Sequence, residues 1–334
     1  MVTVHDVAAR SGVSIATVSR ALREPHRVSG DTRDRVLAAI DELGYRPNRA
    51  AASLRRGRTG VIALVVPDIE NPYFSSMTKG AQAMSRERGY GLVVVDTTER
   101  ADVEDEEIRA LRSQIDGLIL VSSRLSDDRL SEVVAENTCV LINRDLGEVG
   151  PATPSVTIDE SAAGRAAIEH LYGLGHRRIA YVGGPATSWS QARRSRGIVE
   201  AAAGLPDLSL VEIAGGAPTS AGGRRVAVEA LETGATAVVA YNDLVALGML
   251  AQWSESGIRV PDQVSLVGFD NTFVTGLASP PLTSVGADLR ELGDAAVELL
   301  LERIDARGGT PESDIHRSLH PRLAVRASTA PPAR

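Results

Sequence analysis

Hydrophobic positions follow two different periods along the 334 residues of the chain. In residues 1–45 they recur every three or four positions within three short stretches, a spacing that predicts three helices. From residue 61 onward, short apolar runs such as GVIALVV alternate with longer amphipathic stretches, which predicts strands alternating with helices. We therefore expect a small helical unit followed by an α/β region.

The first two predicted helices are short and closely spaced. The first begins after Thr3, which has the capping-box spacing to Asp6, and ends at Gly12. The second, IATVSRAL, is expected to be capped by Ser14. Two short helices joined by a glycine-containing turn form a helix-turn-helix. In the second helix we expect Val18, Ala21 and Leu22 to face inward, and Ile15, Ala16, Thr17, Ser19 and Arg20 to lie at or near the outer face.

A third helix is predicted between a cap at Ser29 or Asp31 and a stop at Gly44. The three helices have two interpretations. Either the second helix lies in the DNA major groove, with Thr17 and Ser19 donating to phosphates, or the unit is a three-helix bundle with no ligand. The next segment, RPNRAAASLRRGRTG, is rich in arginine and alanine, which favours the DNA-binding interpretation. The segment itself is either a bare linker or a short helix.

Charge is distributed unevenly along the chain. Residues 1–60 contain 11 arginines, no lysine and 6 acidic residues, whereas the whole chain carries a formal net charge of -7. The amino-terminal unit is therefore basic and the remainder strongly acidic. A basic unit is a candidate for an anionic partner such as nucleic acid, although a solvated surface can have the same composition.

The region after residue 60 is expected to form two sheets. Alternating strands and helices predict parallel sheets covered on both faces, and the strands fall into two successive blocks, about 61–158 and 159–285. The strands are predicted at 61–66, 92–95, 117–121, 140–143, 155–158, 179–183, 210–214, 237–240, 264–268 and 282–285.

Polar residues follow several of these strands, at the edge where open parallel sheets bind their ligands. Each of them taken alone has a structural explanation, since Asn242 or Asp243 can cap the helix LVALGML and Asp270 can close a turn. Five polar loops at successive strand ends nevertheless favour a binding cleft between two lobes. These loops are PDIENPYF, NRDL, GGPATSWSQARR, YNDL and GFDN.

Other classes of protein have no support in the sequence. None of the motifs G-x-G-x-x-G, G-x-x-x-x-G-K-[ST] and G-x-S-x-G occurs, so we expect no enzyme and no cofactor. Cys139 is the single cysteine, in an apolar run, which predicts a buried thiol. His316 and His320 have a spacing that a helical metal site uses, but Pro321 follows, so we expect two surface residues and no metal. The absence of an 18-residue apolar stretch and of an export signal predicts a cytoplasmic protein with no membrane partner.

Five motifs carry a family resemblance: VTVHDVAARSGVSIATVSRAL, VSGDTRDRVLAAIDELGYRPNRAAASLRRGRTG, HRRIAYVGGP, AYNDLVALGML and VPDQVSLVGFDN. They resemble the lactose and galactose repressor family of bacterial transcription regulators, over essentially the whole chain and in the family's order. The resemblance implies an α/β protein with an amino-terminal three-helix helix-turn-helix domain. A hinge helix and two doubly wound parallel-sheet lobes of periplasmic-binding-protein type would follow. The implied boundaries are 1–46 for the DNA-binding domain, 47–59 for the hinge helix or linker and 60–334 for the effector-binding and dimerisation domain. Within this last domain, lobe 1 is expected at about 60–158 and 288–316, and lobe 2 at about 159–285 and 320–330.

The resemblance also implies the DNA contacts. The second helix would read the major groove, and Leu54 of the hinge helix would wedge into the minor groove beside Ala51, partly unstacking a base step. Ile15 and Ala16 can touch only thymine methyl groups, so Arg20, whose fork fits guanine O6 and N7, is expected to make the strongest base contact. The implied DNA-binding residues are Thr3, Ser14, Ile15, Ala16, Thr17, Ser19, Arg20, Asn48, Arg49, Ala51 and Leu54.

The implied effector contacts suit a sugar or a sugar derivative, because amide, carboxylate and guanidinium groups bind hydroxyls and an aromatic ring stacks on a sugar. Relatives often place an aromatic residue where this chain has Ala217, so one wall of the site is expected to be open or supplied by Trp189. Purines and other small metabolites stay open as alternatives. The implied contacts are Asn71, Tyr73, Phe74, Arg144, Ser190, Arg194, Asn242 and Asp270.

These expectations combine into a homodimeric repressor that binds a pseudo-palindromic operator, with lobe closure on the effector changing the spacing of the two hinges. Induction and corepression are both compatible with this mechanism. The tail ASTAPPAR lacks apolar heptads, which predicts a dimer and not a dimer of dimers. The alternative is a solute-binding protein with no DNA role, which the basic head and the missing export signal disfavour.

Overall fold

The computed structural model describes residues 2–45, 58–147, 153–306 and 316–333. Its internal contacts divide the chain into two units, Met1–Gly60 and Val61–Arg334. Four of the expected DNA contacts lie outside the described residues, namely Asn48, Arg49, Ala51 and Leu54.

The first unit contains the helices α1 (Val4–Ser11), α2 (Ile15–Arg23) and α3 (Gly30–Leu43), with a short 3₁₀ helix, η1 (Pro25–Arg27), before α3. The three α-helices were predicted from the sequence, and η1 was not. Small apolar side chains at helical spacing form a single core between them. The buried core residues are Val7, Ala8, Val18, Ala21, Val36 and Ala39.

The ends of these helices are fixed as the sequence predicts. The backbone N–H and the hydroxyl of Thr3 both donate to the carboxylate of Asp6, at 2.8 Å each, and these bonds lower the pKa of Asp6. Ser14 Oγ accepts from the backbone N–H of Thr17 at 3.2 Å at the start of α2. Gly44 ends α3 with a φ of 62°, a left-handed conformation that favours glycine.

Two expectations for α2 need correction. Leu22 does not face inward, because Val18 and Ala21 already fill the contact with the neighbouring helices and leave Leu22 36% exposed. Ile15 is half-buried and packs against the core of the unit, so the outer face of α2 consists mainly of shorter and more polar side chains.

The second unit contains two six-stranded sheets. All ten strands predicted from the sequence form within one residue of their expected bounds. The first sheet has the order β11-β5-β4-β3-β1-β2 and the second the order β12-β10-β9-β8-β6-β7. The strands of the first sheet are β1 (Val61–Val66), β2 (Gly91–Asp96), β3 (Gly117–Val121), β4 (Cys139–Ile142), β5 (Ser155–Ile158) and β11 (His316–Leu319). Those of the second sheet are β6 (Arg178–Val182), β7 (Ser209–Ile213), β8 (Ala237–Ala240), β9 (Ser265–Phe269), β10 (Thr283–Gly286) and β12 (Arg322–Ala324).

The pairing of the strands is parallel except at β12, which runs antiparallel to β10. The ten predicted strands therefore form parallel sheets as expected, and β12, which is not one of them, adds an antiparallel edge. The chain passes from one sheet to the other three times, after β5, after β10 and between β11 and β12. We call the part built on the first sheet lobe 1 and the part built on the second lobe 2.

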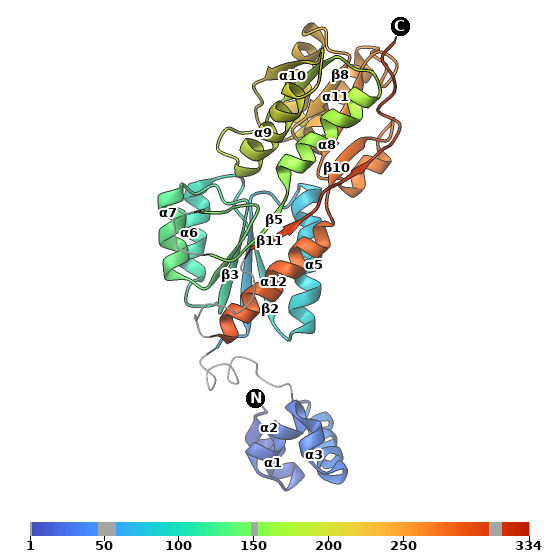
Figure 1. The fold of residues 1–334 in the computed structure, drawn as a ribbon. Helices are drawn as coiled ribbons and strands as arrows, with labels where there is room; N and C mark the ends of the chain where they lie inside the picture. Colours follow the sequence, from blue (N-terminus) through green and yellow to red (C-terminus); the bar gives the residue numbers. More distant parts are fainter. Residues whose placement is uncertain (1, 46–57, 148–152, 307–315, 334) are drawn as a thin grey trace. The chain divides into compact units, whose positions relative to one another are not determined.

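Helices cover both faces of each sheet (Figure 1). Apolar residues alternate along the strands, so that Ile62 and Leu64 of β1 face one helical layer while Ala63 and Val65 face the other. In lobe 1, α5 (Pro72–Glu87) and α12 (Leu289–Asp305) cover one face, and α6 (Ala101–Leu111) and α7 (Asp127–Glu136) the other. In lobe 2 the layers are α8 (Glu160–Gly173) with α9 (Trp189–Ala203), and α10 (Ser220–Glu232) with α11 (Asp243–Glu255).

Paired glycines let α8 and α9 approach backbone to backbone. A Cβ atom added at Gly197 would lie 2.1 Å from the carbonyl oxygen of Ser161, and one added at Gly164 would lie 2.6 Å from that of Arg194. No side chain fits in such contacts. This close packing fixes the position of Arg194 on α9.

Candidate functional site

The outer face of α2 presents the expected DNA-contacting residues in the first unit. Ala16 and Arg20, four residues apart and therefore on one side of the helix, are exposed. Thr17 and Ser19 are half-buried, and Ser14 Oγ and Thr17 Oγ1 lie 2.9 Å apart. Thr3 lies at the start of α1, where its side chain is exposed. No described residue pairs with the guanidinium group of Arg20, which leaves all its donors available.

A polar cavity lies between the two lobes of the second unit. Both lobes contribute side chains, mostly from loops that follow the carboxyl ends of strands. The cavity is lined by Asn71, Tyr73, Phe74, Glu99, Ser122, Arg124, Asn143, Glu160, Ser188, Ser190, Arg194, Pro218, Tyr241, Asn242 and Asp270.

Seven of the eight expected effector contacts are in this lining, and Arg144 is not. The Arg144 guanidinium instead binds the carboxylate of Asp127 at 2.6 Å and the carbonyl of Leu125 at 3.3 Å. Trp189 does not supply a wall, since its ring stacks with Arg193 at 3.7 Å and it is not in the lining. Ala217 is also absent from the lining, and Pro218 and Tyr241 contribute instead.

The backbone is strained at several points of the lining. Glu99, Ser122, Asn143 and Asp270 have φ angles of 60°, 46°, 48° and 97°, in the region that favours glycine. Such conformations cost about 1–3 kcal/mol each and persist only where neighbouring contacts fix them. They turn the chain sharply at the strand ends and determine which side chain faces the cavity.

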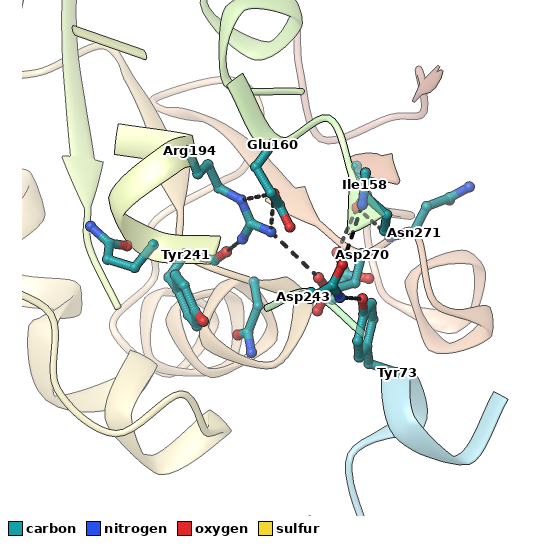
Figure 2. Close-up of polar contacts among 12 residues, drawn as sticks. Tyr73, Ile158, Glu160, Arg194, Tyr241, Asp243, Asp270 and Asn271 are labelled. Carbon is teal, nitrogen blue, oxygen red and sulfur yellow. Dashed lines mark hydrogen bonds and ion pairs between the residues drawn. The ribbon is translucent and has the colours of Figure 1, made fainter. Parts of the chain in front are cut away.

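Arg194 is the most completely bonded side chain of the lobe 2 wall (Figure 2). It is 4% exposed, and its Nε and Nη2 donate to one carboxylate oxygen of Glu160 at 2.9 and 2.7 Å. Its Nη1 donates to the carbonyl oxygen of Tyr241, and its guanidinium lies 4.2 Å from the ring centre of Phe269. Burial alone would lower the pKa of Arg194, but the carboxylates of Glu160 and Asp270 outweigh burial and raise it. Arg194 therefore stays charged and fixed.

Asp270 is the acceptor that the protein leaves open. No described residue donates a hydrogen bond to its carboxylate, and the nearest cation, Arg194 Nη2, is 3.9 Å away and already bonded to Glu160. Burial raises the pKa of Asp270 well above its usual range; Arg194 opposes the shift, and Asp243 and Glu160 add to it. A buried carboxylate without donors is unfavourable, so a ligand that donates hydrogen bonds here would relieve that cost.

Lobe 1 presents mainly donors to the same cavity. Asn143 Nδ2 donates to the hydroxyl oxygen of Tyr73, so the phenolic hydrogen of Tyr73 is left for another acceptor. Arg124 is held by Glu99 at 2.6 Å through Nε and by the carbonyl of Ser122 at 2.7 Å through Nη1. No described residue accepts from its Nη2. The cavity therefore offers a ligand donors from Arg124 and Tyr73 on lobe 1 and an acceptor from Asp270 on lobe 2.

Sequence reasoning missed eight residues of the lining, namely Glu99, Ser122, Arg124, Asn143, Glu160, Ser188, Pro218 and Tyr241. A signal existed for Asn143 and Tyr241, which stand next to expected contacts in the loops NRDL and YNDL. Glu160 begins α8 directly after the first passage between the lobes, and no local motif marks it.

Neither a membrane span nor a metal site is found in the described part of the chain. No described helix is long and apolar enough to cross a bilayer. Within the same residues, no three His, Cys, Asp or Glu side chains cluster as metal ligands would. His316 and His320 are both exposed, as expected, and His316 Nδ1 lies 2.9 Å from Ser155 Oγ.

A helix-turn-helix unit followed by two α/β lobes around a polar cavity defines a ligand-responsive DNA-binding protein. Residues 3–48 match the family of bacterial regulatory proteins named after lacI, and residues 168–329 match a periplasmic binding protein-like domain. The transcriptional regulator DegA of Bacillus subtilis is 34% identical over 98% of this chain and 98% of its own.

Two solved structures are similar over nearly the whole chain. The lac repressor dimer bound to operator and an anti-inducer has a TM-score of 0.84 at 28% identity, covering 98% of this chain and 99% of that one. The regulator CelR in complex with cellobiose has a TM-score of 0.71 at 32% identity, covering 98% and 100%. The chain belongs to the lacI family of bacterial regulatory proteins. It is a DNA-binding transcriptional regulator, and the alternative of a solute-binding protein without a DNA role is disfavoured.

Proposed function

We propose that the chain is a homodimeric repressor whose affinity for a pseudo-palindromic operator is controlled by a small polyhydroxylated effector, a sugar or sugar derivative, bound between the lobes. The observation that carries the proposal is a polar cavity between the lobes, in which no described residue donates to the Asp270 carboxylate, in a chain that begins with a helix-turn-helix. In this proposal the cavity binds the effector and catalyses no reaction. The protein acts in the cytoplasm, where it can reach the DNA.

The effector contacts we propose are the seven expected residues that line the cavity, together with Arg124. A ligand hydroxyl can donate to Asp270 while a ligand oxygen accepts from Arg124 or from the Tyr73 hydroxyl. Such a ligand would bridge the lobes and favour one arrangement of them. It would change operator affinity by its differential affinity for that arrangement.

The DNA contacts we propose are Thr3, Ser14, Ile15, Ala16, Thr17, Ser19 and Arg20 of the head, with Asn48, Arg49, Ala51 and Leu54 of the segment that follows. Arg20 supports the base-reading role because its side chain is exposed and no described residue pairs with its guanidinium. Thr17 and Ser19 are suited to phosphate contacts, which position the helix without reading sequence.

Exposed apolar side chains support the homodimer. Val93 and Val94 lie on β2, an edge strand of the first sheet, and are 38% and 39% exposed. In lobe 2, Phe273 and Leu277 are 67% and 78% exposed. We propose that the dimer interface covers these side chains. Light scattering coupled to gel filtration should give about twice the chain mass of 35.2 kDa, and a tetramer mass would contradict the dimer.

Selection of bound sequences from random duplex DNA tests the head. We expect enrichment of a palindrome whose half-sites each contain a guanine that Arg20 requires. The Arg20→Ala variant should lose selection at that position only. Enrichment of no sequence by the full-length protein would contradict the regulator mechanism.

Thermal unfolding in the presence of D-ribose, D-galactose, D-glucose, cellobiose and D-gluconate tests the cavity. At least one compound should raise the melting temperature of the full-length protein, and Arg124→Gln should remove the shift. Arg144→Gln is the matched control, because the two arginine side chains are 11% and 12% exposed and each pairs with one carboxylate, but only Arg124 lines the cavity. Equal loss in both variants would contradict the assignment of Arg124.

A further inference from the structure

The loop that carries Asp270 into the cavity has an unfavourable backbone conformation. Asp270 and its neighbour Asn271 have φ angles of 97° and 48°, and two consecutive non-glycine residues rarely adopt such angles. The contacts around the loop must therefore hold it in place. Without them the loop would relax and move the Asp270 carboxylate.

Three backbone N–H groups fix this loop, and two of them depend on one buried carboxylate. Asp270 N donates to the carbonyl of Val285 at 2.8 Å, a bond within the sheet edge. Asn271 N donates to Ser284 Oγ at 3.0 Å, and Ser284 Oγ in turn donates to Asp243 Oδ1 at 2.6 Å. The backbone N–H and hydroxyl of Thr272 both donate to Asp243 Oδ2, at 2.8 Å each.

Asp243 stands behind the cavity wall and does not line it. It is 1% exposed and no described cation lies within ion-pair distance of it, so its burial is compensated mainly by its hydrogen bonds, with a further electrostatic contribution from Arg326. Burial raises the pKa of Asp243 to about 6, while the bonds from Ser284 and Thr272 favour the carboxylate form. A Cβ atom at Gly268 would lie 2.6 Å from Asp243 Oδ1, so strand β9 leaves room for this carboxylate. Figure 2 shows Asp243 beside Asp270 and Asn271.

We propose that Asp243 is a positioning residue for the effector: through Thr272 and Ser284 it holds the strained loop so that Asp270 projects into the cavity, and it does not touch the effector itself. The inference rests on the proposed effector site and adds to it a residue that controls effector affinity from outside the lining. It separates Asp243 from its neighbour Asn242, which does line the cavity and caps α11 by accepting from Val245 N at 2.8 Å.

Amide hydrogen exchange in the full-length protein tests the loop without any ligand. Asp243→Asn keeps the size of the side chain but places an amide NH₂ group against the donors of Ser284 and Thr272. Ser284→Ala removes only the link to Asn271. Both should speed exchange of peptides covering residues 270–275 at least tenfold. Thr283→Val is the matched control: it removes a buried hydroxyl from the adjacent position of β10, one that bonds Arg326 N and Thr329 and not the loop. Unchanged exchange in both Asp243→Asn and Ser284→Ala would overturn the proposal.

A comparison of effector and operator affinity separates positioning from general damage. The probe is whichever compound of the five-member panel binds the unaltered protein, measured by titration calorimetry. Asp243→Asn and Ser284→Ala should weaken its binding at least tenfold while operator affinity without the compound changes less than twofold, and Thr283→Val should change neither. Equal affinity for the compound in all variants overturns the role of Asp243 and leaves the proposed function intact. If no panel member binds the unaltered protein, the proposed effector class itself is wrong.

Discussion

Two arginines show how differently the head and the two-lobed unit present their functional groups. Arg20 on α2 is exposed and no described residue binds its guanidinium. Arg194 on α9 is 4% exposed and is bonded to Glu160 and to the backbone of Tyr241. The head offers DNA a surface that needs no internal support, whereas the cavity is built from buried charges that support one another. Substitutions should therefore affect binding alone in the head, and stability together with binding in the lobes.

Replacement of Arg194 should have the largest effect. Arg194→Met leaves the Glu160 carboxylate, which is 3% exposed, without its partner, and breaking a buried pair in this way costs about 3–5 kcal/mol of unfolding free energy. The exposed bidentate pair between Arg224 and Glu255 is the control, and Arg224→Met should cost far less, because water screens this pair. Urea denaturation measures both. Equal costs would remove the contrast between buried and exposed charges.

A methyl group added between α8 and α9 should have the next largest effect. Gly197→Ala places a Cβ atom 2.1 Å from the Ser161 carbonyl, so the helices must separate, at a cost of about 2–3 kcal/mol. The shift should also displace Arg194 and weaken effector binding. Gly204→Ala, near the end of the same helix, meets its neighbours only at 3.6 Å and should be tolerated. A destabilised Gly204→Ala together with an unaffected Gly197→Ala would contradict the close packing.

Removal of Arg20 should act on DNA binding alone. Arg20→Ala is expected to lose about 1–3 kcal/mol of affinity for the selected operator at fixed salt, with an unchanged melting temperature. Arg10→Ala is the control, since Arg10 is also an exposed arginine of the head but is paired with Glu42 at 2.6 Å. A fall in melting temperature for Arg20→Ala would show that this side chain supports the fold and not only the interface.

The acidity of the cavity should appear in the pH dependence of effector binding. Burial raises the pKa of Asp270, and its ionised form is the better acceptor for ligand hydroxyls. Effector affinity is therefore highest above that raised pKa and falls as the pH drops through it, by up to tenfold per pH unit, or about 1.4 kcal/mol. Titrations between pH 8 and pH 5 check this for the unaltered protein, and Asp270→Asn should bind weakly at every pH. An affinity that rises on acidification would contradict the role given to the carboxylate.

The sequence predicted the strands well because each is a short run rich in apolar residues, buried on both faces in the middle of each sheet and partly exposed at the edge strands β2 and β7. It predicted most of the cavity because the polar loops follow those strands directly. Arg144 was expected in the cavity instead of Asn143. The left-handed φ at Asn143 changes which of the two neighbouring side chains faces the cavity, and the sequence does not show this backbone conformation. Glu160 and Arg124 were missed because each reaches the cavity through an ion pair with a residue distant in the chain, Arg194 and Glu99 respectively. Leu22 was misplaced because helical periodicity alone does not show which of two adjacent apolar residues the short core accepts.

Fluorescence anisotropy of the full-length protein on the selected operator, with and without the compound that binds the protein, measures whether the cavity controls DNA binding. The salt concentration must be fixed, because phosphate contacts make operator affinity depend strongly on salt. We expect the compound to change operator affinity at least tenfold in the unaltered protein. In Asp270→Asn that change should vanish while operator affinity without the compound stays the same. An effect of equal size in Asp270→Asn, or no effect of any bound compound on operator affinity, would contradict control of DNA binding from this cavity.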